Sequence, residues 1–153
     1  MLRSAIVPER IVDLDEYRED QGRALALVWA GMVLGVSFLA TPAKFLAPSL
    51  PRPIALEVGR QTFRTFGHVE MVLAALLGLS APMSPRRRVL ALTPSLIVLG
   101  QALWLRPRLD ARTLQAMDGR TPQSSSGLHV AYVAGEAAKL VILLAFGTRT
   151  GQE

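Results

Sequence analysis

Residues 128–147, LHVAYVAGEAAKLVILLAFG, form an apolar stretch that carries Glu136 and Lys139 near its middle. A hydrocarbon core of about 30 Å is crossed by roughly 17 to 25 helical residues, so this stretch is long enough to span a membrane. A charged side chain at that depth costs about 2.5 to 3.5 kcal/mol on insertion scales. If the stretch is a membrane span, both side chains are therefore expected to face the interior of a helical bundle.

Three more stretches are uncharged over long runs, namely residues 24–43, 71–85 and 89–105. A soluble amphipathic helix would carry charge every few positions on its wet face. Half of the 153 residues are hydrophobic, which is high for a soluble domain. The sequence therefore predicts an all-α, polytopic membrane protein, a bundle of four transmembrane helices near residues 24–43, 64–81, 89–105 and 128–147. Four prolines between Pro42 and Pro53 predict an extended loop after the first span.

The two ends of the chain are predicted to be tails, residues 1–23 polar and acidic, residues 148–153 short. Two alternatives are open for residues 1–23, a short amphipathic helix that is broken at Pro8 and a disordered segment. The first tail has no apolar segment of the kind found in a cleavable signal, so the first span should direct insertion. Basic residues are equal in number on the two sides, and the positive-inside rule does not choose an orientation. We expect an inner membrane with both termini in the cytoplasm, because the three arginines at 86–88 sit in a very short hairpin that should resist translocation. The net charge of +5 comes mostly from arginines at the membrane borders. It suits anionic lipid headgroups better than nucleic acid.

Polar residues of the last span fall on one helical face, since about 100° separates successive residues. This face carries His129, Tyr132, Glu136 and Lys139. Glu136 and Lys139 are spaced i, i+3 and are expected to pair. Two interpretations are open, an internal salt bridge that fixes helix packing and a path for a solute or proton. Glu70 in the second span and Gln101 in the third complete the predicted intramembrane polar site.

Several basic residues lie in or beside the loops that follow the first and third spans, on one side of the membrane. Arginine forks bind carboxylate and phosphate groups well, which favours a mouth for an anion or a lipid. Ordinary anchoring at the membrane interface is the alternative. The predicted mouth consists of Lys44, Arg60, Arg64, Arg106 and Arg108.

Two histidines, His68 and His129, lie early in the second and fourth spans, on that same side. Two neutral imidazoles on facing helices can hold a metal or a haem iron. Hydrogen bonds to a loop carbonyl or to a lipid phosphate are the simpler interpretation. The sequence has no cysteine, so thiolate ligands are excluded. Gly31 and Gly35 form a small-xxx-small step that predicts close helix packing, within the bundle or in a homodimer.

Three segments taken in order carry a family resemblance: FLATPAKFLAPSLPRPIALEVGRQTFRTFGH at 38–68, LWLRPRLDARTLQAM at 103–117 and GLHVAYV at 127–133. Over residues 24–147 the chain resembles the bacterial domain-of-unknown-function family 4149, which is similar to the eukaryotic transmembrane protein 205 group. Relatives usually carry an aromatic Phe-Pro-Tyr-type run where this chain has TFRTFG, and GEAAK at 135–139 is not a family feature. The resemblance implies a compact four-span bundle in a bacterial membrane and no settled activity.

Three functional hypotheses follow. The first is a membrane protein that binds or passes a small solute or ion through a polar bundle interior. The second is a membrane redox protein that binds haem or a metal through His68 and His129. The third is a structural accessory subunit of a larger membrane complex. The sequence contains no nucleophile–base pair, Gly-rich phosphate loop or paired-carboxylate site, so we do not expect an enzyme.

Overall fold

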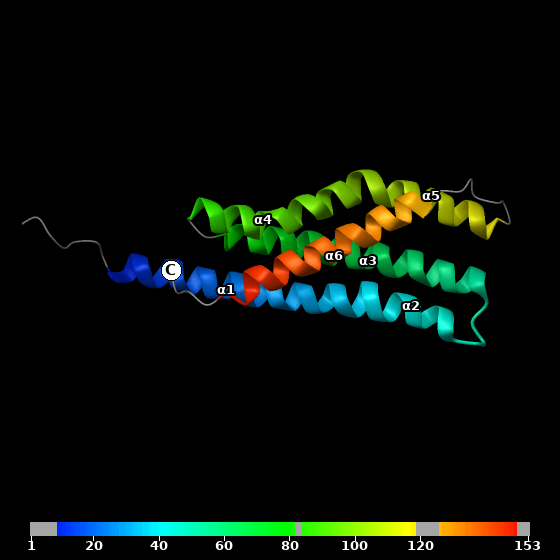
Figure 1. Ribbon diagram of the computed structural model, residues 1–153, viewed down its shortest axis with the longest axis horizontal. Helices are drawn as coiled ribbons and strands as arrows, with labels where there is room; N and C mark the ends of the chain where they lie inside the picture. Colours follow the sequence, from blue (N-terminus) through cyan, green and yellow to red (C-terminus); the bar gives the residue numbers. More distant parts are fainter. Residues whose placement is uncertain (1–8, 82–83, 119–125, 150–153) are drawn as a thin grey trace, which may run out of the picture.

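The computed structural model describes residues 9–81, 84–118 and 126–149, and over these residues the secondary structure is helical. Figure 1 shows the long helices lying side by side along one axis. The elements in chain order are α1 (Glu9–Val33), the π-helical η1 (Leu34–Ala40), α2 (Thr41–Ala43), the 3₁₀ turn η2 (Lys44–Leu46), α3 (Arg52–Leu79), α4 (Pro85–Gly100), the π-helical η3 (Gln101–Leu105), α5 (Arg106–Met117) and α6 (Ser126–Gly147).

The four long helices close on one another to form a bundle. Helix α1 packs against α6 and α3, and α4 packs against α3 and α6, while α5 lies against α3. The shared core is built from small and large apolar side chains around Trp29, which is completely buried. The other core residues are Ala26, Ala30, Val33, Phe66, Leu73, Leu77, Ala91, Val98, Leu143 and Phe146.

The outside of the bundle is apolar and part of its inside is charged, the reverse of a soluble protein. Large apolar side chains such as Val72, Leu96 and Val141 are exposed, whereas Glu70 and Lys139 are buried. Among the described residues, three helical segments are long and apolar enough to cross a membrane: Glu16–Leu46, Pro85–Met117 and Gly127–Gly147. The all-α bundle and the membrane class predicted from the sequence are confirmed.

Of the four long helices, α3 lies outside these three apolar segments. Its 28 residues give a length of roughly 42 Å, and it begins at Arg52, well before the predicted span at 64–81. The part of α3 before Met71 carries Glu57, Arg60, Arg64, His68 and Glu70, which is why α3 is not one of the three strongly apolar segments. Its last nine residues, from Met71 on, are apolar.

Of three local expectations, one is confirmed in its helical alternative and two need correction. Residues 9–23 of the predicted tail are helical and continuous with the first span. The predicted loop is shorter than expected, because Pro42 lies in the first turn of α2, where a missing N–H is tolerated, and the helical path continues to Leu46. The prediction that Gly31 and Gly35 pack closely inside the bundle is wrong, since no side chain or neighbouring backbone lies within 4 Å of a Cβ placed at either.

Candidate functional site

A cluster of buried charges lies at the centre of the bundle. Lys139 on α6 and Glu70 on α3 are both 0% exposed. The Lys139 ammonium contacts Glu70 Oε1, and it lies 2.7 Å from Glu136 Oε1. Arg106, at the start of α5, donates from its terminal NH2 nitrogen to Glu70 Oε2 at 2.5 Å. Two carboxylates are therefore matched by two cations.

Uncharged donors complete the coordination of the two carboxylates. Trp29 Nε1 on α1 donates to Glu70 Oε1 at 3.3 Å. Ser37 Oγ donates to Glu136 Oε2 at 2.8 Å, and Gln101 Nε2 donates to Glu136 Oε1 at 3.0 Å. Ser37 belongs to η1 and Gln101 to η3, so both uncharged donors to Glu136 come from π-helical turns, which occur frequently at functional sites.

This network explains how an apolar span can hold Glu136 and Lys139. A buried charge without a partner costs several kcal/mol, whereas paired and hydrogen-bonded charges offset much of that cost. The predicted i, i+3 contact between Glu136 and Lys139 is present, and Glu70 and Gln101 join it. Tyr132 is also buried nearby, and its backbone carbonyl accepts from Gln101 Nε2 at 3.4 Å.

A pocket of about 540 Å³ lies beside the network, toward the end of the bundle where residues 47–51 join the first and second long helices (Figure 1). Its wall comes from the end of the first span, the N-terminal half of α3, the η3–α5 segment and the start of α6. Arg106 and Tyr132 line the pocket and also border the buried network, so the two features are contiguous. The other lining residues are Thr41, Lys44, Phe45, Leu56, Gly59, Arg60, Phe63, Arg64, Gly67, His68, Met71, Ala102, Pro107, Leu109, Asp110, Thr113 and His129.

The charge on the pocket wall is mainly positive. The cations are Lys44, Arg60, Arg64 and Arg106, and among the described lining residues Asp110 is the acidic one. Four of the five residues predicted to form the mouth are thus brought together. Arg108 is not, because its guanidinium lies 4.5 Å from the Trp104 ring and donates to the Trp104 carbonyl at 2.8 Å.

Aromatic rings form much of the remaining wall. The rings of Phe63 and Tyr132 meet edge to face, with centroids 5.3 Å apart. The Lys44 ammonium lies 5.1 Å from the ring centroid of Phe45 and 5.9 Å from that of Phe63. The pocket can therefore contact an apolar body as well as a charge.

Two glycines of α3 make room for two of the cations. A Cβ on Gly59 would overlap the Lys44 ammonium, and a Cβ on Gly67 would overlap the Arg106 guanidinium. Both glycines are buried and lie two helical turns apart, so they share one face of α3. The cations can lie directly against the helix backbone only because these positions have no side chain.

Three hydrogen-bonding groups on the pocket wall are buried without a partner among the described residues. They are Arg60 Nε, Arg106 Nε and the Tyr132 hydroxyl. Most buried polar groups in proteins are paired, so unpaired groups at one site suggest a bound molecule that would complete them. Each of the three can donate a hydrogen bond.

Both histidines line this pocket and are exposed, His68 from α3 and His129 from α6. No group of three or more His, Asp or Glu residues that could hold a metal ion occurs within residues 9–81, 84–118 and 126–149. The structure thus brings both imidazoles to one pocket, and the haem or metal alternative stays a prediction.

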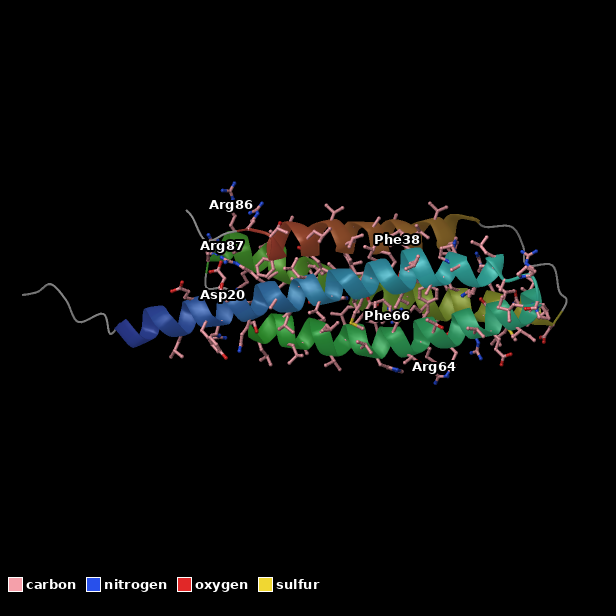
Figure 2. The ribbon with its side chains drawn as sticks, turned by 90° about the horizontal axis from the view of Figure 1, so that it is seen from below. Asp20, Phe38, Arg64, Phe66, Arg86 and Arg87 are labelled. Atoms are coloured by element: carbon pink, nitrogen blue, oxygen red, sulfur yellow. The ribbon has the colours of Figure 1, made fainter. Side chains whose placement is uncertain are left out.

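A separate set of ion pairs lies at the opposite end of the bundle. Glu19 Oε1 on α1 accepts from Arg87 at 2.5 Å and from Arg23 at 2.8 Å. Figure 2 shows Asp20, Arg86 and Arg87 at this end. The acidic N-terminal extension and the arginine hairpin therefore meet, which the sequence analysis did not predict.

Trp29 and Ser37 also belong to the site and were not predicted. Each lies in a long apolar run, where nothing in the sequence tells which turn faces a carboxylate on another helix. One signal was available for Arg106, which was predicted only as part of the mouth. Glu70 and Glu136 outnumber Lys139 in the interior of the predicted spans, since Arg64 is the first residue of its span, and this imbalance calls for a second cation at the end of a span.

Comparison with known proteins gives one match. Residues 24–122 match the family described as Domain of unknown function (DUF4149). No curated protein and no solved structure matches the chain. The matched residues contain Glu70, Arg106 and the pocket cations but end before α6, which supplies Glu136 and Lys139. The likeness to the eukaryotic transmembrane protein 205 group stays a prediction.

Proposed function

Because the chain belongs to the DUF4149 family, whose description names no activity, we propose from its geometry that it is a membrane-embedded binding protein for a small organic anion. The observation that carries this proposal is the pocket of about 540 Å³ whose wall holds four cations and one carboxylate. That volume lies within the range of small-molecule sites, roughly 300 to 1,000 Å³.

The chemistry of the wall favours an anionic group on an apolar or aromatic body. Arginine presents a planar fork of donors that matches carboxylate, phosphate or sulfonate oxygens. The Nε groups of Arg60 and Arg106 are buried without a partner among the described residues, and such an oxygen would satisfy them after a small shift of either side chain. The rings of Phe45, Phe63 and Tyr132 would contact the rest of the ligand.

The closed interior of the bundle favours binding of a ligand in the pocket over passage of a solute through the bundle. Between the pocket and the centre of the bundle, the interior is filled by Glu70, Lys139 and Glu136, each at most 1% exposed. A solute could pass only if this network separated, and that would expose several buried charges. Passage through the bundle is therefore a second step that the proposed binding site does not require.

We place the bundle in a bacterial inner membrane, with α3 crossing beside the three more apolar segments and both termini on the cytoplasmic side. Support for α3 as a span comes from its packing against α1 and α4 within the bundle. Support for the position of the N-terminal extension comes from the contact between Glu19 and Arg87, which brings it to the hairpin. Anionic headgroups are the expected partners of the border arginines.

The test uses the full chain purified into nanodiscs of a zwitterionic lipid. Calorimetric titration with benzenesulfonate, benzoate and inorganic phosphate is compared with benzyltrimethylammonium, which has a similar ring and the opposite charge. We expect saturable binding of at least one aromatic anion and none of the cation. No saturable binding of any anion, or equal binding of the cation, would contradict the proposal.

A second arm of the test separates a free anion from a lipid headgroup. In nanodiscs that contain phosphatidylglycerol, a headgroup ligand would occupy the pocket and lower the apparent affinity for benzenesulfonate beyond the effect of added salt. An unchanged affinity at matched ionic strength would identify a water-soluble anion as the ligand.

The two alternatives from the sequence analysis have distinct signatures. A haem protein would show haem absorbance that is lost in both His68→Ala and His129→Ala. An accessory subunit would bind none of the probes, carry no chromophore and co-purify with a stoichiometric membrane partner.

A further inference from the structure

Arg106 belongs to both the pocket and the buried network, and among the described residues it is the pocket cation that forms an ion pair with the network. Its side chain is 15% exposed and lines the pocket, while its terminal NH2 nitrogen is bound to Glu70 Oε2. The Nε group of the same guanidinium has no partner among the described residues. One edge of this cation is therefore paired, while its Nε group is unpaired and covered by neighbouring atoms.

The guanidinium is in close contact with α3. It lies against the backbone at Gly67, where even a Cβ would overlap it. Tyr132, a buried pocket residue of α6, lies on the same wall. A ligand that reaches Nε would thus meet Arg106 while Glu70 still holds the other edge.

The charge balance makes this sharing unfavourable for the ligand. Glu70 and Glu136 are matched by Lys139 and Arg106. A bound anion adds a negative charge beside a network that is already neutral and screened from water. Two anions on opposite edges of one guanidinium lie about 6 Å apart, and at an effective dielectric constant of ~20 their repulsion corresponds to on the order of a hundredfold in affinity.

We propose that the pocket ligand and Glu70 compete for Arg106, so that occupancy of the pocket weakens the contact between Arg106 of α5 and Glu70 of α3. Occupancy of the pocket is thereby coupled to the buried network. This inference rests on the proposed anion site. The coupling is reciprocal, since whatever loosens the Glu70–Arg106 contact must tighten ligand binding by the same factor. It also offers a route by which a ligand could open the interior below the pocket.

The first experiment measures the affinity for benzenesulfonate in nanodiscs. The probe keeps its charge over the whole working range of pH. Glu70→Gln removes the competing charge but retains an oxygen that can accept from Arg106, and we expect affinity to rise ~10- to 100-fold. The matched control is Glu136→Gln, which neutralises an equally buried carboxylate that contacts Lys139 and not Arg106. It should give a clearly smaller gain.

The outcomes separate this inference from the proposed function. If no protein binds the probe, the anion site itself is wrong. If the parent binds and both variants gain equally, only long-range electrostatics is at work and competition for Arg106 is excluded. A weaker affinity in Glu70→Gln would mean that Glu70 positions Arg106 for the ligand, which also overturns the inference.

A second measurement leaves the network intact, in case Glu70→Gln does not fold. Trp29 Nε1 donates to Glu70 Oε1, so its fluorescence reports on that carboxylate. In a Trp104→Phe background, Trp29 is the remaining tryptophan of the sequence. Saturating benzenesulfonate should shift its emission, while sodium chloride at equal ionic strength should not. An unchanged spectrum at saturation would contradict the coupling.

Discussion

At the scale of single residues, the account depends on Lys139, a lysine buried between two carboxylates. Replacing it with Met leaves Glu70 and Glu136 with one cation, Arg106, and should lower the free energy of unfolding by about 3 to 5 kcal/mol. The double change Lys139→Met with Glu136→Gln restores the balance and should recover much of the loss. Unfolding in detergent, followed by circular dichroism, measures both. Strictly additive losses would show that the two side chains do not interact.

Gly67 provides a second test at this scale. Gly67→Ala places a methyl group where the Arg106 guanidinium lies, so it should displace that cation and destabilise the bundle by about 1 to 3 kcal/mol. The matched control is Gly31→Ala, which meets nothing within 4 Å. Since alanine favours helix, the control should be neutral or stabilising by at most about 1 kcal/mol. Equal thermal stability of both variants would argue against the close approach of Arg106 to α3.

Some of these contacts could be predicted from the sequence and others could not. The pairing of Glu136 with Lys139 follows from i, i+3 spacing within one helix. The contact of Lys139 with Glu70 joins residues 69 positions apart and depends on how α3 and α6 are rotated about their axes. Spacing within a helix fixes which residues share a face, but the rotation is set by packing among all four helices.

At the scale of elements, the acidic N-terminal extension of α1 and the hairpin between α3 and α4 should be neighbours. The chain has no cysteine, so Glu19→Cys with Arg87→Cys gives a clean pair for cross-linking by a short bis-maleimide. We expect efficient intramolecular cross-linking in intact membranes. The control pair Glu19→Cys with Arg52→Cys places the second thiol at the opposite end of α3 and should not react. Equal yields for the two pairs would contradict the described arrangement.

Element boundaries were harder to predict than element types. The apolar runs located all four long helices, because length and lack of charge are sufficient for that. They did not predict the helical extension at residues 9–23 or the continuation past Pro42. The first has only a short amphipathic pattern, which left a helix and a disordered segment as alternatives, and the second depends on the π-helical turns of η1 that precede the proline.

At the scale of the whole molecule, the sequence predicted a membrane bundle with a polar interior and a basic mouth. The bundle follows from the lengths and positions of the apolar runs. The pocket does not, since it forms only where the first span, α3, α5 and α6 converge and where Gly59 and Gly67 let Lys44 and Arg106 approach the helix backbone. Such convergence is a property of the tertiary fold.

The most direct test of the anion site compares two arginines near the same end of the bundle. Arg60 lines the pocket with an unpaired Nε, whereas Arg108 lies outside it and stacks on Trp104. Each is changed to Lys, which keeps the charge but loses the fork, and the affinity for benzenesulfonate is measured by calorimetry in zwitterionic nanodiscs. Arg60→Lys should weaken binding about tenfold or more, and Arg108→Lys should match the parent. Equal affinities for the parent and both variants would contradict the account.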